Sequence, residues 1–465
     1  MKRMTVIPEP VAGELTSLLG RERFLTSAAD RESYAWDNTG NRFVPDAVVL
    51  AQTREEVCAI LRLCHDHRIK VTPRGAGTGN VGGALAVEGG LLLSLQRMNR
   101  IVEISVPDRF AVVEAGVVNG DLQTKLDAYG LFWPPDPSSS RTCTIGGNVA
   151  MCSAGPGAVR WGVTRDWVLG LEAVLIDGTQ IRTGGRTTKG VVGLDMTRLL
   201  VGSEGTLAVV TRAILKLASK PEQRLLSRIS FPSVEMAAAA VSHLLSARQS
   251  PSAIEFLDGS ALDLLRRETT LALPAQARAM LLLEVAGGVS GLKELALEMI
   301  EGIQRFKPLE WSPPVDGSEA ASVWAARSAL SPILKKLAPK RINEDVVVPV
   351  SRLPLLMTGL ARISDESKIP IVNFGHAGNG NIHVNLLVDP RDPAIMGRVP
   401  GVLDRVFRLV LDLDGSLSGE HGVGTQKRDH IAWELDQACL NLQREIKKVF
   451  DPMGLLNPGK VWPRS

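Results

Sequence analysis

The chain has 465 residues, with 53 lysine and arginine residues against 50 aspartate and glutamate residues, so its net charge of +3 indicates no strongly acidic or basic partner. Its length exceeds one ordinary domain, and its 45% hydrophobic and 22% charged residues are typical of a globular protein. Because the sequence has no basic run with interleaved aromatic residues and no apolar run of about eighteen residues, we expect neither a nucleic-acid partner nor a membrane-spanning helix.

The first predicted elements form a strand, a helix and a second strand. Strands are expected at residues 47–50 and 70–72, and between them Thr53 and Glu56 have the spacing of a capping box that opens a helix. The glycine-rich loop 73–83 follows the second strand. It offers a row of backbone N–H groups with no side chains in the way, which is how a phosphate or pyrophosphate is bound.

This loop also contains the G-x-G-x-x-G pattern of dinucleotide sites, at Gly77, Gly79 and Gly82. A nicotinamide-binding Rossmann site needs a helix directly after the loop and an acidic residue about twenty positions later. Here a glycine pair interrupts the following segment, and Asn99-Arg100 stand where the acid belongs. We therefore reject a Rossmann site, and the alternative to a phosphate cradle is a plain glycine-rich turn.

Two more glycine-rich stretches follow, at residues 134–150 and 202–207, and a strand is expected directly after the second, at 208–211. From about residue 220 strands alternate with helices. Strands are expected at 227–231, 253–257 and 279–285, and helices at 233–247 and 290–304. This order suits an antiparallel sheet covered on one face.

A histidine-rich segment holds His376 and His383, seven residues apart around a turn at 378–380, and Glu420 and His421 follow some forty residues later. Residues seven apart on a continuous strand face opposite sides, so positive φ angles in the turn are needed to bring both imidazoles to one point. Two histidines and a carboxylate with an open position form the ligand set of catalytic zinc or a similar divalent metal. The alternative is that each histidine is a hydrogen-bonded polar group of a loop or core. The spacing does not decide which residue is a ligand and which is a base.

Taken in order, the three glycine-rich stretches resemble the flavin-binding half of the vanillyl-alcohol-oxidase type of FAD enzymes. The second half resembles the FAD-linked 2-hydroxy acid dehydrogenases, which include D-lactate dehydrogenase, the glycolate oxidase flavin subunit and D-2-hydroxyglutarate dehydrogenase. The resemblance covers nearly the whole chain, and its matching stretches in the second half are 323–327, 343–349, 374–385, 419–422 and 451–460.

The resemblance implies an α+β fold with a two-subdomain FAD-binding domain over residues 1–220, a substrate cap with an antiparallel sheet over 221–415, and a C-terminal segment, 416–465, that returns to the FAD-binding domain. It implies non-covalent FAD, because no histidine occupies the first glycine-rich loop, where some relatives attach flavin. The pyrophosphate would be bound by Arg74, Gly75, Ala76, Gly77, Thr78 and Gly79. The other parts of FAD would be surrounded by Asp136, Ser138, Gly146, Gly147, Glu204, Gly205 and Val210.

The resemblance also implies a catalytic set. The metal would be Zn²⁺, or alternatively Mn²⁺ or Fe²⁺, held by His376, His383 and Glu420. His421 would be the base and Arg327 would clamp the substrate carboxylate, for which the alternative is a solvated helix-surface charge. Asn385 could hydrogen-bond the same substrate oxygens.

The expected function is FAD-dependent oxidation of a small D-2-hydroxy acid, D-lactate or glycolate, to the 2-oxo acid. Asn343 favours a small substrate, because a dicarboxylate-binding member of this branch has lysine there. The alternatives are a D-2-hydroxyglutarate dehydrogenase, a non-redox flavin transferase, which would not need the metal ligands, and a non-catalytic flavin subunit of an electron-transfer complex.

The five cysteines are scattered without C-x-x-C spacing, which predicts neither disulfides nor an iron–sulfur cluster. Electrons would therefore pass to an external acceptor: a quinone, a cytochrome, an electron-transfer flavoprotein or an iron–sulfur partner subunit. Because no signal-peptide pattern follows Met1, we expect a cytoplasmic protein, peripheral to a membrane only through its acceptor. A homodimer is an open alternative for its assembly.

Overall fold

In the computed structural model, which describes residues 7–247 and 250–463, the chain divides into two compact units. Unit 1 comprises Met1–Ala154, Val163–Lys220 and Glu420–Ser465, and unit 2 comprises Gly155–Gly162 and Pro221–Gly419. The short segment 155–162 therefore groups with unit 2, although it lies inside the range expected for the FAD-binding domain.

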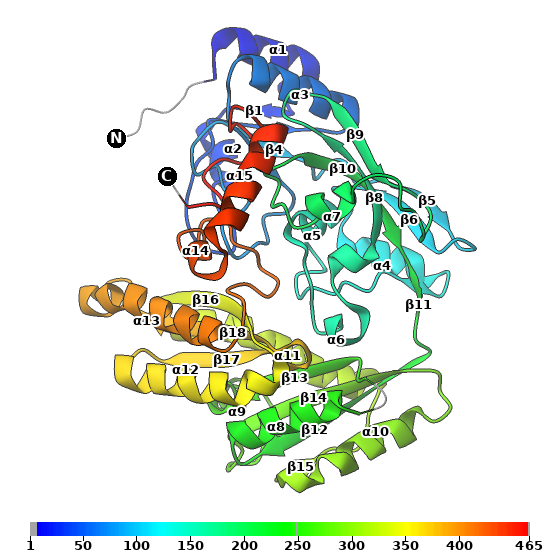
Figure 1. Ribbon diagram of the computed structural model, residues 1–465, viewed down its shortest axis with the longest axis vertical. Coiled ribbons are helices and arrows are strands. Elements are labelled where there is room, and N and C mark those ends of the chain that lie inside the picture. Colours follow the sequence, from blue (N-terminus) through cyan, green and yellow to red (C-terminus); the bar gives the residue numbers. More distant parts are fainter. Residues whose placement is uncertain (1–6, 248–249, 464–465) are drawn as a thin grey trace. The chain divides into compact units, whose positions relative to one another are not determined.

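The first sheet of unit 1 is mostly parallel (Figure 1). Its elements are α1 (Glu9–Leu19), β1 (Phe24–Leu25), α2 (Ala28–Ser33), β2 (Ala47–Leu50), α3 (Arg54–Asp66), β3 (Val71–Arg74) and β4 (Leu91–Ser94). The strand order is β1-β2-β4-β3, with β1 antiparallel to β2. Helices α1 and α3 bury apolar residues such as Leu15 and Leu61 in the same core as Val49, so each helix covers the sheet with its apolar stripe.

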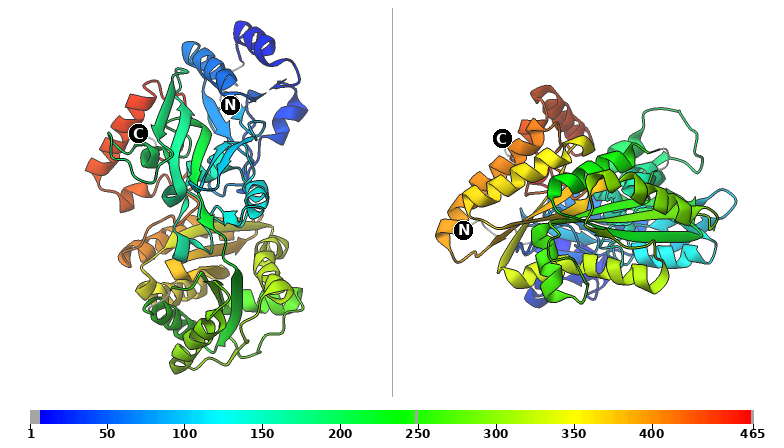
Figure 2. Two further views of the ribbon diagram at one scale, coloured as in Figure 1. Left: turned by 90° about the vertical axis from the view of Figure 1, so that its right-hand side faces the viewer. Right: turned by 90° about the horizontal axis from the view of Figure 1, so that it is seen from below.

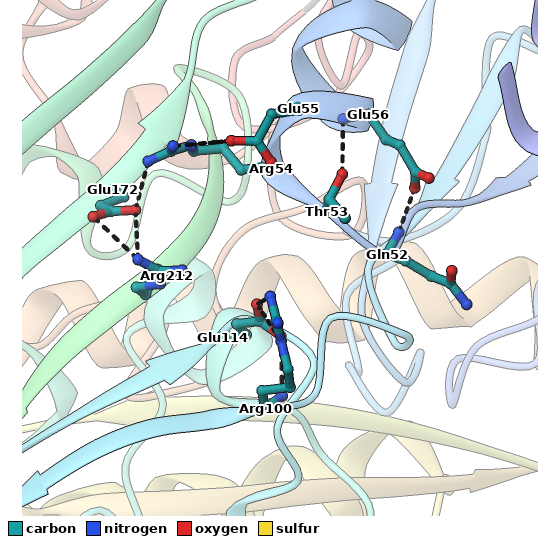
Figure 3. Close-up of polar contacts among 9 residues, drawn as sticks. All are labelled: Gln52, Thr53, Arg54, Glu55, Glu56, Arg100, Glu114, Glu172 and Arg212. Carbon is teal, nitrogen blue, oxygen red and sulfur yellow. Dashed lines mark hydrogen bonds and ion pairs between the residues drawn. The ribbon is translucent and has the colours of Figure 1, made fainter.

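The start of α3 is capped as the sequence predicts, with one difference (Figure 3). The Glu56 backbone N–H donates to Thr53 Oγ1 at 3.1 Å. In a full capping box the Glu56 carboxylate would accept from the N–H of Thr53, but it accepts from the N–H of Gln52 at 2.7 Å. The predicted helix start is confirmed, and the carboxylate bond lies one residue earlier than predicted.

The second sheet of unit 1 is antiparallel, with the order β5-β6-β10-β8-β9. Its strands are β5 (Ile101–Ser105), β6 (Phe110–Glu114), β8 (Val168–Val174), β9 (Gln180–Gly184) and β10 (Val209–Lys216). The helices are α4 (Asn119–Asp127), α5 (Ile145–Met151), η1 (Thr164–Trp167) and α7 (Met196–Leu200), and β7 (Leu131–Phe132) pairs with β11 (Ala218–Ser219). Arg54 of α3 and Arg212 of β10 both contact Glu172 of β8, at 3.1 and 3.2 Å, so an ion-pair network joins α3 to this sheet (Figure 3).

The C-terminal segment of unit 1 returns to the first sheet. After α14 (Ile431–Glu434) and α15 (Gln437–Phe450), Leu456 forms a bridge with Val71 of β3. The backbone N–H of Asn457 donates to the Val71 carbonyl at 2.7 Å. The chain end is therefore held beside the glycine-rich loop that follows β3.

The described strands of unit 2 form one antiparallel sheet in the order β15-β12-β14-β13-β17-β18-β16. These strands are β12 (Gln223–Phe231), β13 (Ala253–Asp258), β14 (Ala279–Gly287), β15 (Glu310–Trp311), β16 (Lys340–Val347), β17 (Ile371–His376) and β18 (Asn381–Val388). The longer helices are α8 (Val234–Leu245), α9 (Gly259–Glu268), α10 (Leu292–Gly302), α11 (Gly317–Leu337), α12 (Leu353–Ser367) and α13 (Pro393–Asp412). The short ones are α6 (Ala158–Trp161), η2 (Gln304–Phe306), η3 (Val350–Arg352) and η4 (Ala377–Asn379).

Helices cover both faces of this sheet (Figure 2). Helices α8, α10, α12 and α13 share one core with Ile229 and Val384, and α9 and α11 share another with Leu282 and Phe374. The expectation of a sheet covered on one face is therefore wrong, because α11 closes the second face. None of the described helices is long and apolar enough to cross a membrane.

Candidate active site

A pocket of about 1370 Å³, including the space at its open mouth, lies within unit 1. It is lined by loop 73–84, by residues of 137–153 and 200–210, and by Glu420 and His421. Of the predicted cofactor residues, Asp136 does not line the pocket and is exposed. The others all do: Arg74, Gly75, Ala76, Gly77, Thr78, Gly79, Ser138, Gly146, Gly147, Glu204, Gly205 and Val210.

Two glycines of the first loop occupy positions that no side chain can fill. A Cβ on Gly75 would lie 2.3 Å from Thr144 Oγ1, and a Cβ on Gly77, where φ is 70°, would lie 2.1 Å from Arg74 Nη2. The Arg74 guanidinium is itself fixed, because it donates to the Trp36 carbonyl at 2.8 Å. The loop therefore presents bare backbone to the pocket, which fits a cofactor whose phosphates approach the chain closely.

Alanine substitutions in this loop should separate backbone strain from cofactor contact. Gly77→Ala should lower both the melting temperature of the apo-protein and its FAD affinity, because the new Cβ meets Arg74 at a positive φ. Gly79→Ala has open space around its Cβ, so the apo-protein should melt like wild type while FAD affinity falls about tenfold as the methyl group meets the pyrophosphate. Thermal unfolding and FAD titration measure both effects. Wild-type FAD affinity in Gly79→Ala would contradict pyrophosphate binding here.

Glu204 holds the segment that carries His421 at the pocket. Its carboxylate accepts from the backbone N–H groups of Val423 at 2.7 Å and Gly424 at 2.8 Å. Burial raises the pKa of Glu204, and these two N–H groups act in the opposite direction. A Cβ on Gly422, where φ is 84°, would lie 2.8 Å from Glu204 Oε1, so the turn requires glycine. Glu204, predicted as a flavin contact, thus also positions the predicted base.

His421 has a partner that sequence reasoning missed. Asn80 Nδ2 lies 3.0 Å from His421 Nε2, and Asn38 Nδ2 donates to Asn80 Oδ1 at 2.5 Å. All three residues line the pocket. An asparagine in a glycine-rich loop carries no sequence signal for a partner 341 residues away.

Lys460 is a buried lysine with an unusual pKa. Its Nζ donates to Asn457 Oδ1 at 2.5 Å. Burial lowers the pKa of Lys460 to about 7, and the negative charge of Glu204 opposes the shift. Below about pH 7 Lys460 is therefore charged in the folded protein, and the full cost of burying that charge lowers the free energy of unfolding.

The unfolded chain keeps the Lys460 proton up to a pKa of about 10.4. Between pH 7 and 10 the unfolded state then binds more protons than the folded state, so this residue makes the free energy of unfolding rise with pH. Between pH 7 and 10 the free energy of unfolding of the wild-type apo-protein should rise by roughly 3–5 kcal/mol more than that of Lys460→Met. Urea unfolding at pH 6, 8 and 10 measures it, and equal slopes would contradict the prediction.

The two predicted metal-binding histidines come together within unit 2. The ring centroids of His376 and His383 are 5.2 Å apart, with ring planes at 88°. Strand β17 ends at His376, and of residues 378–380 only Gly380 takes a positive φ, 74°. A Cβ there would lie 1.9 Å from the Val348 carbonyl oxygen. The expected fold-back is therefore present, with the strained position confined to one glycine.

Glu255 of β13 lies between the predicted metal site and the predicted substrate clamp. Its side chain is 1% exposed and lies opposite His376 in the sheet register. His376 Nδ1 hydrogen-bonds to one carboxylate oxygen, and Arg327 contacts the other through Nε and Nη2, both at 2.7 Å. Burial alone would raise the pKa of Glu255, but the attraction of His376 and Arg327 holds it below its usual value. The sequence signal was present, because Glu255 is an acid with apolar residues on both sides within a strand.

The Glu255 contact fits a metal-binding histidine. Because Nδ1 of His376 faces the carboxylate, Nε2 is the ring nitrogen that would serve as a metal ligand. Carboxylates orient metal-bound histidines in this way and raise their basicity. The donor chemistry of unit 2 is therefore that of a site for a divalent cation.

The Arg327 side chain is fixed by contacts within unit 2 and is not exposed to solvent as a surface charge would be. Its Cζ lies 4.5 Å from the centre of the Phe374 ring, and its side chain is 11% exposed. The alternative of a solvated helix-surface charge is therefore wrong. Because Glu255 already uses Nε and one side of Nη2, a substrate carboxylate would meet the outer edge of the guanidinium, at Nη1 and the second N–H of Nη2.

Asp345 of β16 is buried beside His383, a predicted metal ligand. Its carboxylate is fully buried and accepts from Asn381 Nδ2 at 2.6 Å and from the Gly419 N–H at 2.9 Å. Its Oδ1 lies 3.9 Å from His383 Nδ1. Asp345 therefore anchors the chain one residue before Glu420.

Asn385, predicted to hydrogen-bond the substrate, is engaged within unit 2. Its Nδ2 donates to the carbonyls of Val372 at 2.9 Å and His383 at 3.0 Å. Its Oδ1 accepts from Asn343 Nδ2 at 2.7 Å, and the side chain is fully buried. These bonds hold the backbone of His383, so the amide acts on the site through that residue.

Family models match both parts of the chain. Residues 45–184 match an FAD binding domain, and residues 220–461 match the C-terminal domain of FAD linked oxidases. A glycolate oxidase subunit GlcD from Bacillus subtilis is 38% identical over 99% of this chain and 98% of the relative. A probable mitochondrial D-lactate dehydrogenase from Danio rerio is 35% identical over 98% of this chain and 92% of the relative.

Solved structures with similar folds include p-cresol methylhydroxylase, with a TM-score of 0.82, 16% identity and 98% of each chain covered. Another is alkyldihydroxyacetonephosphate synthase, with a TM-score of 0.78, 18% identity, and 98% of this chain and 87% of that chain covered. These likenesses confirm the predicted α+β fold of the vanillyl-alcohol-oxidase type. The chain therefore belongs to the FAD-linked 2-hydroxy acid dehydrogenase family and is an FAD-dependent oxidoreductase.

Proposed function

We propose that the protein oxidises a D-2-hydroxy acid to the 2-oxo acid, using FAD and a divalent metal. The observation that carries the proposal is the buried contact between Glu255 and His376, which orients an imidazole as metal ligands are oriented. The names of the relatives, glycolate oxidase subunit and D-lactate dehydrogenase, support a 2-hydroxy acid as substrate. A flavin transferase or a non-catalytic subunit would not need this buried pair.

We assign the metal to His376, His383 and Glu420. Glu420 directly follows Gly419, whose N–H donates to Asp345 at 2.9 Å. Covalent geometry therefore keeps the Glu420 Cα about 3.8 Å from the Cα of an anchored residue. Zn²⁺ suits two imidazoles and a carboxylate, and Mn²⁺ and Fe²⁺ accept the same donors. When bound, such a cation lowers the pKa of a coordinated hydroxyl by several units.

The remaining steps belong to side chains of this protein. Arg327 would hold the substrate carboxylate through the outer edge of its guanidinium, which fixes the face of the substrate. His421 would accept the hydroxyl proton as general base. The residues that line the pocket of unit 1 would hold FAD, which would supply the hydride acceptor at N5. The substrate thus loses one proton from the hydroxyl and one hydride from the α-carbon, which converts the alcohol to a ketone.

The two electrons removed from the substrate would then need an acceptor outside the chain. We propose a quinone, a cytochrome, an electron-transfer flavoprotein or an iron–sulfur subunit. The naming of the Bacillus subtilis relative as a subunit supports a partner subunit, without naming its cofactor.

The test is anaerobic mixing of the FAD-loaded protein with a panel of D- and L-2-hydroxy acids, with D-lactate, glycolate and D-2-hydroxyglutarate included. We expect rapid bleaching of the flavin absorbance by D-acids or glycolate. Removal of metal by a chelator should abolish bleaching, and added Zn²⁺ or Mn²⁺ should restore it. Absence of bleaching by every acid would rule the proposal out, and bleaching that survives verified metal removal would rule out the metal.

A further inference from the structure

A half-buried arginine, Arg341, lies on the α11 side of the sheet of unit 2, and its Nη1 atom is buried. Alternation along β16 places Arg341, Asn343 and Asp345 on one face, and Asp345 is the register partner of His383. Leu387, the register partner of Arg341, packs in the core that α9 and α11 form with the sheet. Arg341 therefore shares a face with His383, one of the proposed metal ligands.

Arg341 differs from the other arginines of this face. Arg327 and Arg224 each pair with a glutamate, at 2.7 and 2.8 Å, and Arg228 donates to a backbone carbonyl at 3.0 Å. The buried Nη1 of Arg341 has no hydrogen-bond partner among residues 7–247 and 250–463. Burial lowers the pKa of Arg341, and no neighbouring acid opposes the shift. A buried positive charge without a counter-charge is unfavourable, so an anion from outside the chain fits this position.

The distance along β16 between Arg341 and Asp345 is comparable with the length of a short substrate. Two strand residues span about 6.6 Å, so the Cα of Arg341 lies about that far from Asn343 and about 13 Å from Asp345, beside His383. The long arginine side chain can cover about half of the second span. The remaining distance matches a chain of a few carbons between a hydroxy acid group at the histidines and an anion at Arg341.

We propose that Arg341 binds a second, distal acidic group, so that the preferred substrate is a 2-hydroxy dicarboxylate. This inference rests on the proposed function and deepens it. Asn343 favoured a small substrate because it supplies no second positive charge, but Arg341 supplies that charge from two residues earlier on the same face.

The test compares two acids of equal length, D-2-hydroxyglutarate and D-2-hydroxyvalerate, in anaerobic flavin reduction. The wild-type second-order rate constant should be about 100-fold or more higher for the dicarboxylate, because the monocarboxylate leaves a buried charge unpaired. Arg341→Gln should lower the second-order rate constant for the dicarboxylate about 100-fold and change that for the monocarboxylate by less than about threefold. Arg341→Lys should keep part of the preference. Lys340→Gln, whose side chain points to the other face, should behave as wild type.

Equal effects of Arg341→Gln on both acids, or no effect on either, would overturn the inference. A binding assay keeps it separate from the proposed function. 2-Oxoglutarate should raise the melting temperature of the metal-loaded wild-type holoenzyme more than 2-oxovalerate does, and Arg341→Gln should remove that difference. If no 2-hydroxy acid reduces the flavin, the proposed function fails and this binding difference alone decides the inference. Equal shifts with both oxo acids would then overturn it.

Discussion

Glu255→Gln should destabilise the protein by about 3 kcal/mol and weaken its binding of a divalent metal about 10- to 100-fold. Glutamine keeps the shape of the side chain but removes its charge. Arg327 and His376 then lose the counter-charge that both contact, and the guanidinium, with a side chain only 11% exposed, is left without its ionic partner. The substitution also removes the carboxylate that orients His376, so stability and metal affinity should fall together.

Two measurements check this result without reference to turnover. Urea unfolding of the metal-free protein gives the loss of stability, and titration of the folded protein with Zn²⁺ or Mn²⁺ gives the loss of affinity. Glu310→Gln is the matched control, because Glu310 lies exposed on edge strand β15 of the same sheet. Wild-type metal affinity in a folded Glu255→Gln protein would contradict the proposed role of His376 as a ligand.

Much of the local structure could be predicted from the sequence. The strands before and after α3, the cap at Thr53 and the turn between His376 and His383 each depend on residues close together in the chain. The glycine-rich loops were identified for the same reason, since bare backbone at a positive φ requires glycine at Gly77.

The missed residues depend on strand register and loop packing between distant segments. Glu255 contacts His376 only because β13 lies beside β17, a pairing between residues 121 positions apart. Asn80 contacts His421 across 341 positions. No spacing rule encodes such pairs. An acid between apolar residues of a buried strand, as at Glu255, indicates that a partner exists but not which residue it is.

His421→Ala should lower the rate of flavin reduction by about 10²- to 10⁴-fold, the usual contribution of a general base, with FAD content at the wild-type level. The imidazole lines the pocket and lies 3.0 Å from Asn80 Nδ2, but another residue holds the backbone of its loop. Glu204 does so, through the N–H groups of Val423 and Gly424, and those bonds do not involve the deleted ring. The substitution should therefore remove a proton acceptor and leave the cofactor site standing.

Stopped-flow absorbance gives the reduction rate, and the flavin-to-protein ratio gives the FAD content. The matched control is His67→Ala, because His67 is exposed at the end of α3 and should be replaced without effect. A wild-type reduction rate in His421→Ala would place the base elsewhere. Loss of FAD together with activity would instead assign His421 a structural role. A slow rate of flavin reduction together with wild-type FAD content would assign His421 to proton removal and not to cofactor binding. Cofactor binding is expected to depend on Glu204 and the loop glycines, which the substitution leaves in place.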